Sequence, residues 1–252
     1  MITVKCAAAQ AKMRAAGRVV EETLQLLERN IRTGVSTKAL NDLAEDFIRS
    51  KGAIPSFLGY RGFPASLCVS VNEQVVHGIP DRYRLRDGDI VSCDVGAIFQ
   101  SYHGDAARTF LVGQVAEEAQ KLVRVTRECF FKGLKFCRSG YRVSDISLAI
   151  QRHAESHGYG VVRALTGHGI GTSLHEDPEV PNFFSPKARM RLQPGMTLAI
   201  EPMINMGTWR IRRLDDGWTE VTEDGLPSAH YENTVLITEG EPELLTGAEE
   251  RP

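Results

Sequence analysis

The chain has 252 residues, of which 42% are hydrophobic and 25% charged, and its formal net charge is −2. These proportions are typical of a soluble globular protein, with enough residues for one large domain or two small ones. The small net charge gives no general attraction to nucleic acid or to an anionic membrane. No apolar run approaches the roughly 20 residues that a membrane-spanning helix needs. The composition therefore favours neither a nucleic-acid-binding nor a membrane protein.

The N-terminal stretch and the cysteines indicate a compartment. "MITVKCAAAQAKMRAAG" contains no apolar stretch of about 7–15 residues of the kind found in a secretory signal. The five cysteines include no C-x-x-C pair, which argues against a disulfide framework and against a cysteine-ligated zinc site. We therefore expect a protein of the reducing cytoplasm.

Two segments of 19 residues each begin and end with glycine: 34–52 and 140–158. In each, a serine (Ser36 or Ser144) can cap a helix, apolar residues recur at helical spacing, and the closing glycine can end the helix. Another amphipathic helix precedes each segment, at roughly 9–30 and 116–136. The sequence therefore predicts two helix pairs, offset by 106 residues.

A similar offset of 107 residues separates two strands that end in a carboxylate. "RLRDGDIVSCD" and "RLQPGMTLAIE" both read Arg-Leu-x-x-Gly, then a strand, then Asp94 or Glu201. Asp105 and Glu232 are each followed eight residues later by glycine. Chance similarity of short glycine-bounded segments is the alternative, but the ordered recurrence favours a duplication.

The duplication predicts the fold class. Helix pairs followed by strands indicate an α+β (or α/β) fold in which two halves, roughly 9–115 and 116–245, are related by a pseudo-twofold axis. We expect a single catalytic domain over residues 1–252, with the four carboxylates converging near that axis.

The stretch "CDVGAIFQSYHGDAARTF" places two aspartates in a segment otherwise typical of strands, although aspartate is a poor strand residue. If its arms form a hairpin that turns near Phe99 and Gln100, Asp94 lies opposite Asp105 with both side chains on one face. Opposed carboxylates repel each other unless something positive lies between them, and a divalent metal ion is the natural candidate. The alternative is a pair of exposed aspartates near the turn, held by arginines such as Arg108.

The second half supplies further candidate ligands. "TGHGIGTSLHEDP" contains His168, "AIEPMI" contains Glu201 after an apolar strand, and "AHYENTVLI" contains Glu232 before one. Four carboxylates and one imidazole form a ligand set for two divalent ions such as Mn, Fe, Co or Zn. Two such ions, about 3.5–4 Å apart, can share and activate a water, so the predicted chemistry is hydrolysis.

Other histidines lie near these ligands. His77 in "NEQVVHGIP" and His175 are either ordinary loop residues or neutral donors to a substrate amide or a developing oxyanion. His103, next to the Gly104–Asp105 pair, is a candidate for orienting a ligand. No role is predicted for three others: His153, His157 and His230.

Five motifs closely resemble those of type I methionine aminopeptidases of bacterial form: "VNEQVVHGIP", "CDVGAIFQSYHGDAARTF", "GHGIGTSLHEDP", "IEPM" and "AHYENT". The resemblance runs from about residue 9 to residue 245. It implies the pita-bread fold, in which two related halves form a central antiparallel sheet flanked by helices. It also implies a metal-dependent hydrolase that removes the initiator methionine from nascent proteins and peptides when the second residue is small.

The resemblance further implies roles for individual residues. Two divalent ions would be held by five ligands: Asp94, Asp105, His168, Glu201 and Glu232. Glu201 would also move a proton, His175 would hydrogen-bond the scissile carbonyl, and His77 would contact the backbone amide of the second residue. The methionine side chain would lie in an apolar pocket formed by four residues: Tyr60, Phe63, Cys68 and Trp218.

Three positions depart from the usual family pattern. Phe57 stands where many relatives have cysteine, Leu174 where an aromatic is common, and Asn233 where histidine is frequent. The first two put the fine shape of the pocket in question. Asn233 follows Glu232 and is expected to act on the hydrogen bonds that support this ligand. Simple core packing is the alternative for three aromatics: Phe57, Tyr60 and Phe63.

Two rival functions stay open at this point. An Xaa-Pro aminopeptidase or prolidase would suit several motifs, but those enzymes usually carry a substantial extra N-terminal domain, and "NEQVVHGIP" is the methionine aminopeptidase form. A non-catalytic peptide- or nucleic-acid-binding protein on this fold tends to lose metal ligands or gain basic extensions. We expect nascent polypeptide N-termini as partners, ribosome proximity, no direct nucleic-acid partner, no membrane and a monomer.

Overall fold

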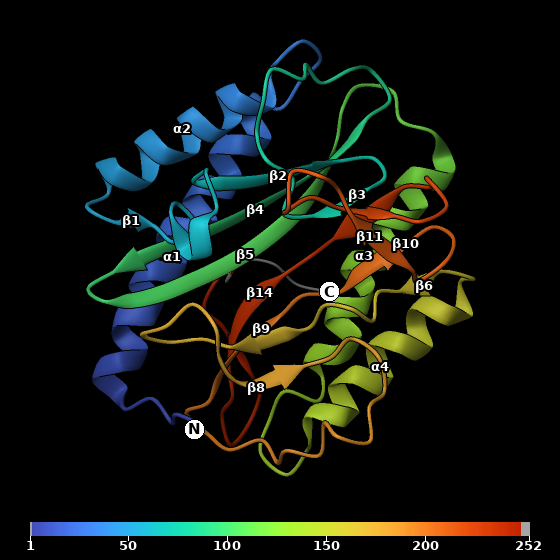
Figure 1. Cartoon of the computed structure of the whole chain (residues 1–252). Coiled ribbons are helices and arrows are strands. Elements are labelled where there is room, and N and C mark those ends of the chain that lie inside the picture. The colour runs from blue at the N-terminus through green and yellow to red at the C-terminus, as the bar shows by residue number, and fades with distance from the viewer. Residues whose placement is uncertain (1, 248–252) are drawn as a thin grey trace.

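The computed structural model describes residues 2–247, and its helices form two pairs (Figure 1). The pairs are α1 (Ala7–Asn30) with α2 (Thr37–Ser50), and α3 (Glu117–Leu134) with α4 (Val143–Ser156). They correspond to the four helices that the sequence predicts. Residues 1 and 248–252 of the expected domain lie outside the described residues. Within residues 2–247, every helix is too short or too polar to cross a membrane.

The strands pair in antiparallel fashion throughout the named sheets. A short 3-10 turn, η1 (Tyr60–Gly62), lies between the first two strands. In chain order the strands are β1 (Ile54–Pro55), β2 (Leu67–Val71), β3 (Gln74–Val76), β4 (Ile90–Phe99), β5 (Tyr102–Leu111), β6 (Gly160–Val161), β7 (Gly167–Gly169), β8 (Glu176–Val180), β9 (Thr197–Ile200), β10 (Met203–Asn205), β11 (Ile211–Arg213), β12 (Glu220–Thr222), β13 (Ser228–His230), β14 (Asn233–Leu236) and β15 (Glu243–Leu244).

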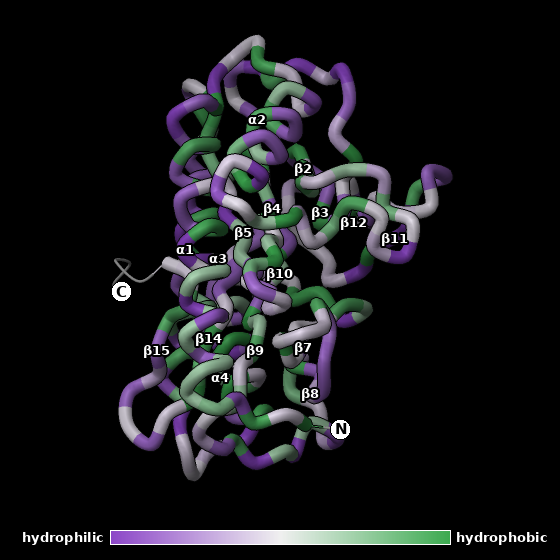
Figure 2. The backbone as a smooth tube through the Cα atoms, turned by 90° about the vertical axis from the view of Figure 1, so that its left-hand side faces the viewer, coloured by the Kyte–Doolittle hydropathy of each residue, from purple (hydrophilic) through white to green (hydrophobic). Residues whose placement is uncertain are grey.

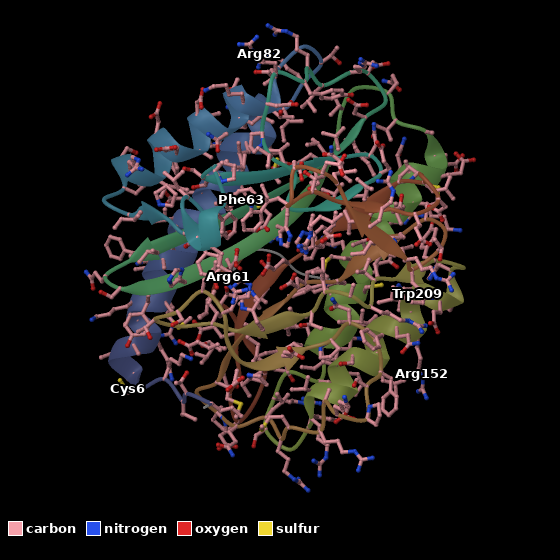
Figure 3. The ribbon with its side chains drawn as sticks, in the orientation of Figure 1. Cys6, Arg61, Phe63, Arg82, Arg152 and Trp209 are labelled. Carbon is pink, nitrogen blue, oxygen red and sulfur yellow. The ribbon has the colours of Figure 1, made fainter. Side chains whose placement is uncertain are left out.

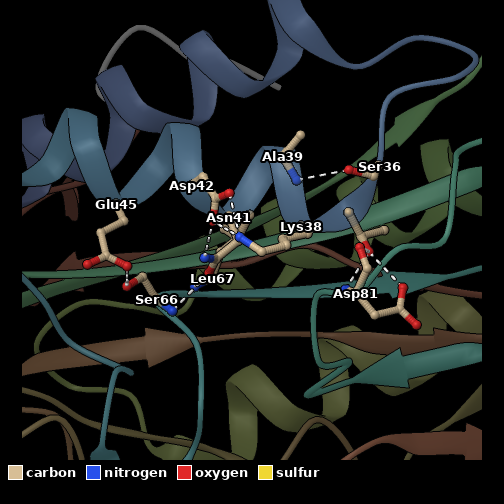
Figure 4. Close-up of polar contacts among 10 residues, drawn as sticks. Ser36, Lys38, Ala39, Asn41, Asp42, Glu45, Ser66, Leu67 and Asp81 are labelled. Atoms are coloured by element: carbon tan, nitrogen blue, oxygen red, sulfur yellow. Dashed lines mark hydrogen bonds and ion pairs between the residues drawn. The ribbon is translucent and has the colours of Figure 1, made fainter.

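Polar side chains cap α2 and tie it to the sheet (Figure 4). The Ser36 hydroxyl accepts a hydrogen bond from the Ala39 amide at 3.2 Å, as a capping serine does. The Asn41 side-chain oxygen accepts from the amides of Ser66 and Leu67, at 2.9 and 3.1 Å, where β2 begins. The predicted helix and its capping serine are therefore confirmed.

Helix α4 is capped differently from its counterpart. The cap predicted at Ser144 is wrong, because the helix begins at Val143 and the Asp145 carboxylate accepts from the Arg142 amide at 2.8 Å. A carboxylate three residues after the N-cap residue reaches back to its amide and also lies at the positive end of the helix, so Arg142 with Asp145 begins the helix before Ser144. Gly158 follows the helix at φ +81°, as predicted.

Strands β4 and β5 form the long hairpin that the sequence predicts, but with a different register. Asp94 pairs with Ala107, and Asp105 pairs with Gly96. The turn residues are 100–101, and both have positive φ values, +49° and +70°. Such a two-residue loop matches the twist of the flanking strands. The predicted direct opposition is therefore wrong by two residues, but both aspartates stay on one face as diagonal neighbours.

Gly104 shows why a glycine precedes the second aspartate. Alternation along β5 directs this position away from the face of Asp105, toward α1. A Cβ at Gly104 would lie 2.9 Å from the Gly17 amide nitrogen and 3.0 Å from the Ala16 carbonyl carbon. Glycine therefore lets α1 lie directly on the strand.

The strands of the two halves meet at one seam, where β5 runs beside the segment that leads into β14 (Figure 1). The Ala107 amide donates to the Glu232 carbonyl at 3.3 Å, and the Glu232 amide donates back at 2.9 Å. Next to them, the Thr234 hydroxyl accepts from the Asp105 amide at 3.0 Å and donates to the Asp105 carbonyl at 2.9 Å. The seam therefore brings carboxylates of both halves together.

Each half has its own hydrophobic core. One core joins α1 and α2 to β2, β4 and β5, and the other joins α3 and α4 to strands of the second half. A third cluster spans the seam and includes Met13 and Phe57 from the first half, and Ile170 and Leu236 from the second. Figure 2 shows the helices gathered along one side of the strands, opposite β3, β11 and β12.

Candidate metal centre

Four carboxylates and one imidazole converge at the seam. Asp94 and Asp105 lie on β4 and β5, His168 lies on β7, Glu201 directly follows β9, and Glu232 directly precedes β14. All five line one cavity of about 530 Å³. Asp105 is only 4% exposed and Asp94 is half-buried, so the alternative of two exposed aspartates is wrong. The structure brings together every residue that the sequence suggested as a ligand.

The ring of His168 is oriented by the backbone. Its Nδ1 donates a hydrogen bond to the Gly169 carbonyl at 2.9 Å, which leaves the lone pair of Nε2 for the cavity. Nε2 lies 3.9 Å from Oδ2 of Asp105 and 3.6 Å from Oε1 of Glu201. Both distances exceed that of a hydrogen bond. One donor atom each of Asp105, His168 and Glu232 lies within 4.8 Å of the other two, an arrangement that suits a bound cation.

The carboxylates are held in an environment that disfavours their charge. Burial raises the pKa of the Asp94 carboxyl to about 7. Burial, together with the neighbouring carboxylates, raises the pKa values of Asp105, Glu201 and Glu232 well above their ordinary values. The Oδ1 atoms of Asp94 and Asp105 are buried without a hydrogen-bond partner among the described residues. A divalent cation would compensate all of these costs, so the residues fit a metal centre.

Two further histidines face the same cavity, as the sequence suggested. Nδ1 of His175 lies 2.8 Å from the Tyr60 hydroxyl, and the two rings stack with centroids 5.3 Å apart. His77 directly follows β3, at φ +59°. Burial lowers the pKa values of both imidazoles to about 4, so both are neutral at pH 7. They are therefore available as uncharged hydrogen-bonding groups.

Part of the cavity lining is apolar or aromatic. The rings of Phe63 and Trp218 meet edge-to-face with centroids 5.1 Å apart, and Tyr60 packs against the same cluster. Cys68 is buried and pairs with Asp94 across β2 and β4, so its thiol lies beside the carboxylates. All four residues expected in a methionine pocket thus line this cavity.

Two of the three departures from the family pattern lie in the same cavity. Phe57 and Leu174 are buried and line the cavity. A Cβ at Gly96 would lie 2.7 Å from the Phe57 ring, so the glycine opposite Asp105 makes room for this aromatic. Arg61 belongs to the lining as well, and Figure 3 shows it in front of the strands near Phe63.

The two residues expected to support the ligands differ in position. The Asn233 side-chain oxygen accepts hydrogen bonds from Arg108 at 2.8 Å and from the Thr246 hydroxyl at 3.0 Å, directly beside Glu232. Nδ1 of His103 instead lies 2.9 Å from the Ser56 hydroxyl, and His103 is not part of the cavity lining.

His230, for which the sequence predicted no role, also reaches the centre. It is 2% exposed, and its Nε2 lies 3.9 Å from Oε2 of Glu201. Burial lowers its pKa to about 3, and neither ring nitrogen has a hydrogen-bond partner among the described residues. Its position two residues before Glu232 is a usable signal, because alternate residues of an extended segment share a face.

A model of metallopeptidase family M24 matches residues 11–239. This chain belongs to metallopeptidase family M24. Among M24 relatives, a methionine aminopeptidase of Clostridium perfringens is 56% identical over 234 residues, which cover 93% of this chain and 94% of that protein. Methionine aminopeptidase 1 of Bacillus subtilis is 50% identical over 234 residues, with the same coverage.

Solved structures of M24 proteins also resemble this chain. A methionine aminopeptidase of Thermotoga maritima matches with a TM-score of 0.95 at 44% identity, covering 98% of this chain and 99% of that one. A prolidase of Pyrococcus furiosus matches with a TM-score of 0.81 at 22% identity, and covers 98% of this chain but 66% of that one. The second likeness shows the fold alone. The expected pita-bread fold is confirmed, and membership of M24 makes this protein a hydrolase that binds divalent metal.

Proposed function

We propose that this M24 enzyme removes the N-terminal methionine from nascent proteins and peptides whose second residue is small. The observation that carries the proposal is one cavity whose lining combines carboxylates and imidazoles with Tyr60, Phe63, Cys68 and Trp218. A thioether side chain packs well against aromatic rings and sulfur. Relatives at 50–56% identity that are named methionine aminopeptidases support the same activity.

We propose five metal ligands: Asp94, Asp105, His168, Glu201 and Glu232. Oxygen ligands with a single imidazole suit two ions such as Mn, Fe, Co or Zn, and the cell's supply decides which are bound. When bound, such ions lower the pKa of a water and polarise the scissile carbonyl. The buried carboxylates with raised pKa values, and their oxygens without hydrogen-bond partners, support this assignment.

The protein's own groups would then bind the substrate and move protons. Glu201, close to the neutral imidazoles of His168 and His230, can take a proton from the attacking water and give it to the leaving amine. His175, held by Tyr60, would donate a hydrogen bond to the carbonyl oxygen as negative charge develops there. His77, which lines the same cavity, would contact the amide of the second residue.

We further propose a cytoplasmic enzyme that works as a monomer and meets its substrates close to the ribosome. Nascent chains are the source of N-terminal methionine, which supports both the compartment and the proximity. All residues of the proposed site come from a single chain, so one copy can hold the complete centre. We also propose that the catalytic unit is one domain built from halves 9–115 and 116–245, because ligands come from both.

The first test is release of methionine from Met-Ala-Ser by the chelator-stripped protein, with Mn, Fe(II), Co or Zn added back singly. Ala-Pro-Ser serves as the matched substrate for a proline-directed enzyme. Metal-dependent cleavage of Met-Ala-Ser alone is the expected result. Cleavage of Ala-Pro-Ser instead would identify a prolidase-type enzyme, and cleavage of neither peptide with metal bound would exclude both activities. Efficient cleavage of Met-Lys or Met-Trp peptides would contradict the small-residue preference.

A further inference from the structure

A second group of metal-binding side chains lies outside the catalytic cavity, between α3 and α4. Glu128 belongs to α3, His153 lies in the last turn of α4, and His157 caps the end of that helix. One donor atom from each residue lies within 4.8 Å of the donor atoms of the other two. None of the three belongs to the lining of the catalytic cavity. The group therefore needs an explanation of its own.

The two histidines are placed as a chelating pair. They are four residues apart on one helix, so their side chains lie on the same face, with ring centroids 4.7 Å apart. Nδ1 of His157 donates a hydrogen bond to the His153 carbonyl at 2.8 Å. This bond orients the ring and leaves the lone pair on Nε2, which is the usual arrangement of a metal-binding histidine.

The carboxylate comes from the neighbouring helix. Oε2 of Glu128 lies 2.8 Å from Nε2 of His153, so the hydrogen that a metal ion would replace already points at the third donor. Nε of Arg124 is 3.9 Å from Oε1 of Glu128, which is longer than a hydrogen bond. All three donor residues are half-buried, so an ion held there would be partly shielded from water.

We propose that Glu128, His153 and His157 form a separate site for a borderline transition-metal ion such as Zn²⁺, which fastens α3 to α4. Two imidazoles and one carboxylate, with water in the fourth position, form a tetrahedral zinc ligand set. Donor atoms around such an ion are about 3.3 Å apart, which lies between the 2.8 Å that separates Nε2 of His153 from Oε2 of Glu128 and the 4.8 Å within which all three donor atoms lie. Binding through Nε2 of His153 would place the hydrogen of this imidazole on Nδ1, and the ion would take the place of the hydrogen bond between Nε2 and Glu128.

The test counts zinc ions per chain. Full-length chelator-stripped protein is loaded with Zn²⁺, freed of excess metal by gel filtration, and measured by atomic emission. We expect His157→Ala and the isosteric Glu128→Gln each to hold one ion fewer per chain than the unchanged protein, with the same circular dichroism. Arg152→Ala is the matched control, because Arg152 lies on the same helix and points away from the body of the protein (Figure 3). It should keep the full count.

Equal zinc counts in the unchanged protein and in the His157→Ala and Glu128→Gln variants would overturn the proposal. A second readout is retention of the untagged protein on immobilised Ni²⁺, whose open positions can accept the histidine pair. Retention that is lost in His153→Ala but kept in Arg152→Ala supports the site. Retention that is the same in both variants contradicts it. Neither measurement depends on the proposed peptidase activity.

Discussion

Glu201 lies between two neutral imidazoles. Nε2 of His168 is 3.6 Å from one of its oxygens, and Nε2 of His230 is 3.9 Å from the other. Burial lowers the pKa values of both histidines to about 3, while burial raises the pKa of the Glu201 carboxyl. A raised pKa makes the Glu201 carboxylate a stronger proton acceptor than an exposed glutamate, which suits a general base.

Replacing Glu201 tests this role directly. Glu201→Gln keeps the shape of the side chain but removes the group that can carry the proton. We expect methionine release from Met-Ala-Ser to fall by about 10²- to 10⁴-fold at saturating metal. Glu223→Gln, at an exposed position, is the control and should retain full activity. An active Glu201→Gln enzyme would remove Glu201 from the mechanism.

His175 is expected to act mainly in the transition state. His175→Ala should lower kcat by about 10²-fold with a smaller change in KM, because its hydrogen bond strengthens as the oxyanion forms. Tyr60→Phe removes only the hydroxyl that lies 2.8 Å from Nδ1, so its effect on kcat should be smaller. Steady-state kinetics of both variants measure the difference. A change confined to KM in His175→Ala would assign the residue to binding alone.

The meeting of the four carboxylates could be predicted because the repeat relates the strands that carry Asp94 and Asp105 to the segments of the other half that carry Glu201 and Glu232. His230 could not be assigned in this way. Its place depends on the pairing of β13 with β10, which sets His230 beside Met203, two residues after Glu201. That contact joins segments far apart in sequence, and the only local sign of it is the position of His230 two residues before Glu232.

At the scale of elements, the hairpin of β4 and β5 shows what local sequence leaves open. Neither Gln100 nor Ser101 is a residue that favours positive φ, so the sequence did not mark the turn, and the register was placed two residues away. The helices were easier to predict, because the spacing of apolar residues and the glycine that ends each helix lie within one short segment. The cap predicted for α4 was wrong because the Asp145 carboxylate accepts from the Arg142 amide, which makes Arg142 the N-cap residue in place of Ser144.

The same turn gives a stability prediction. Replacing Gln100 and Ser101 by Asn and Gly supplies residues that adopt positive φ with less strain, for a gain of about 1 kcal/mol. For a chain of this size we expect Tm to rise by about 2–4 °C in calorimetry. Ser101→Val, which adds a β-branched side chain at φ +70°, should lower Tm. If both variants melt like the unchanged protein, the turn is not strained.

At the scale of the whole molecule, the buried carboxylates link stability to metal and pH. Their raised pKa values mean that the folded protein without metal binds more protons than the unfolded chain. Its free energy of unfolding must therefore fall as pH rises above the unfolded carboxyl pKa of about 4. Buried histidines with lowered pKa values act in the opposite sense, but only below their unfolded pKa of about 6.5.

Between pH 7 and 8 the change in stability comes mainly from the carboxylates. The histidines are then mostly neutral in both the folded and the unfolded protein, and most of the thiols lose their protons at higher pH. We expect the chelator-stripped protein to lose stability across this window in urea unfolding. The metal-loaded protein should change much less, because bound cations keep the carboxylates ionised in the folded state. If the free energy of unfolding changes equally with pH in the two forms, metal binding does not determine the ionisation of these carboxylates.

The seam also has a consequence for the order of events during synthesis. Glu232 is the last candidate ligand along the chain, and it is braced by residues still later: the Thr246 hydroxyl donates to Asn233 and accepts from the Thr234 amide at 3.0 Å. A growing polypeptide that has emerged only as far as residue 231 thus has three carboxylates and no partner strand to close the centre. The enzyme would therefore be inactive during its own synthesis and would become active only when its final strands have paired. A chain that ends at residue 231 should cleave no peptide until a fragment with residues 232–247 is supplied.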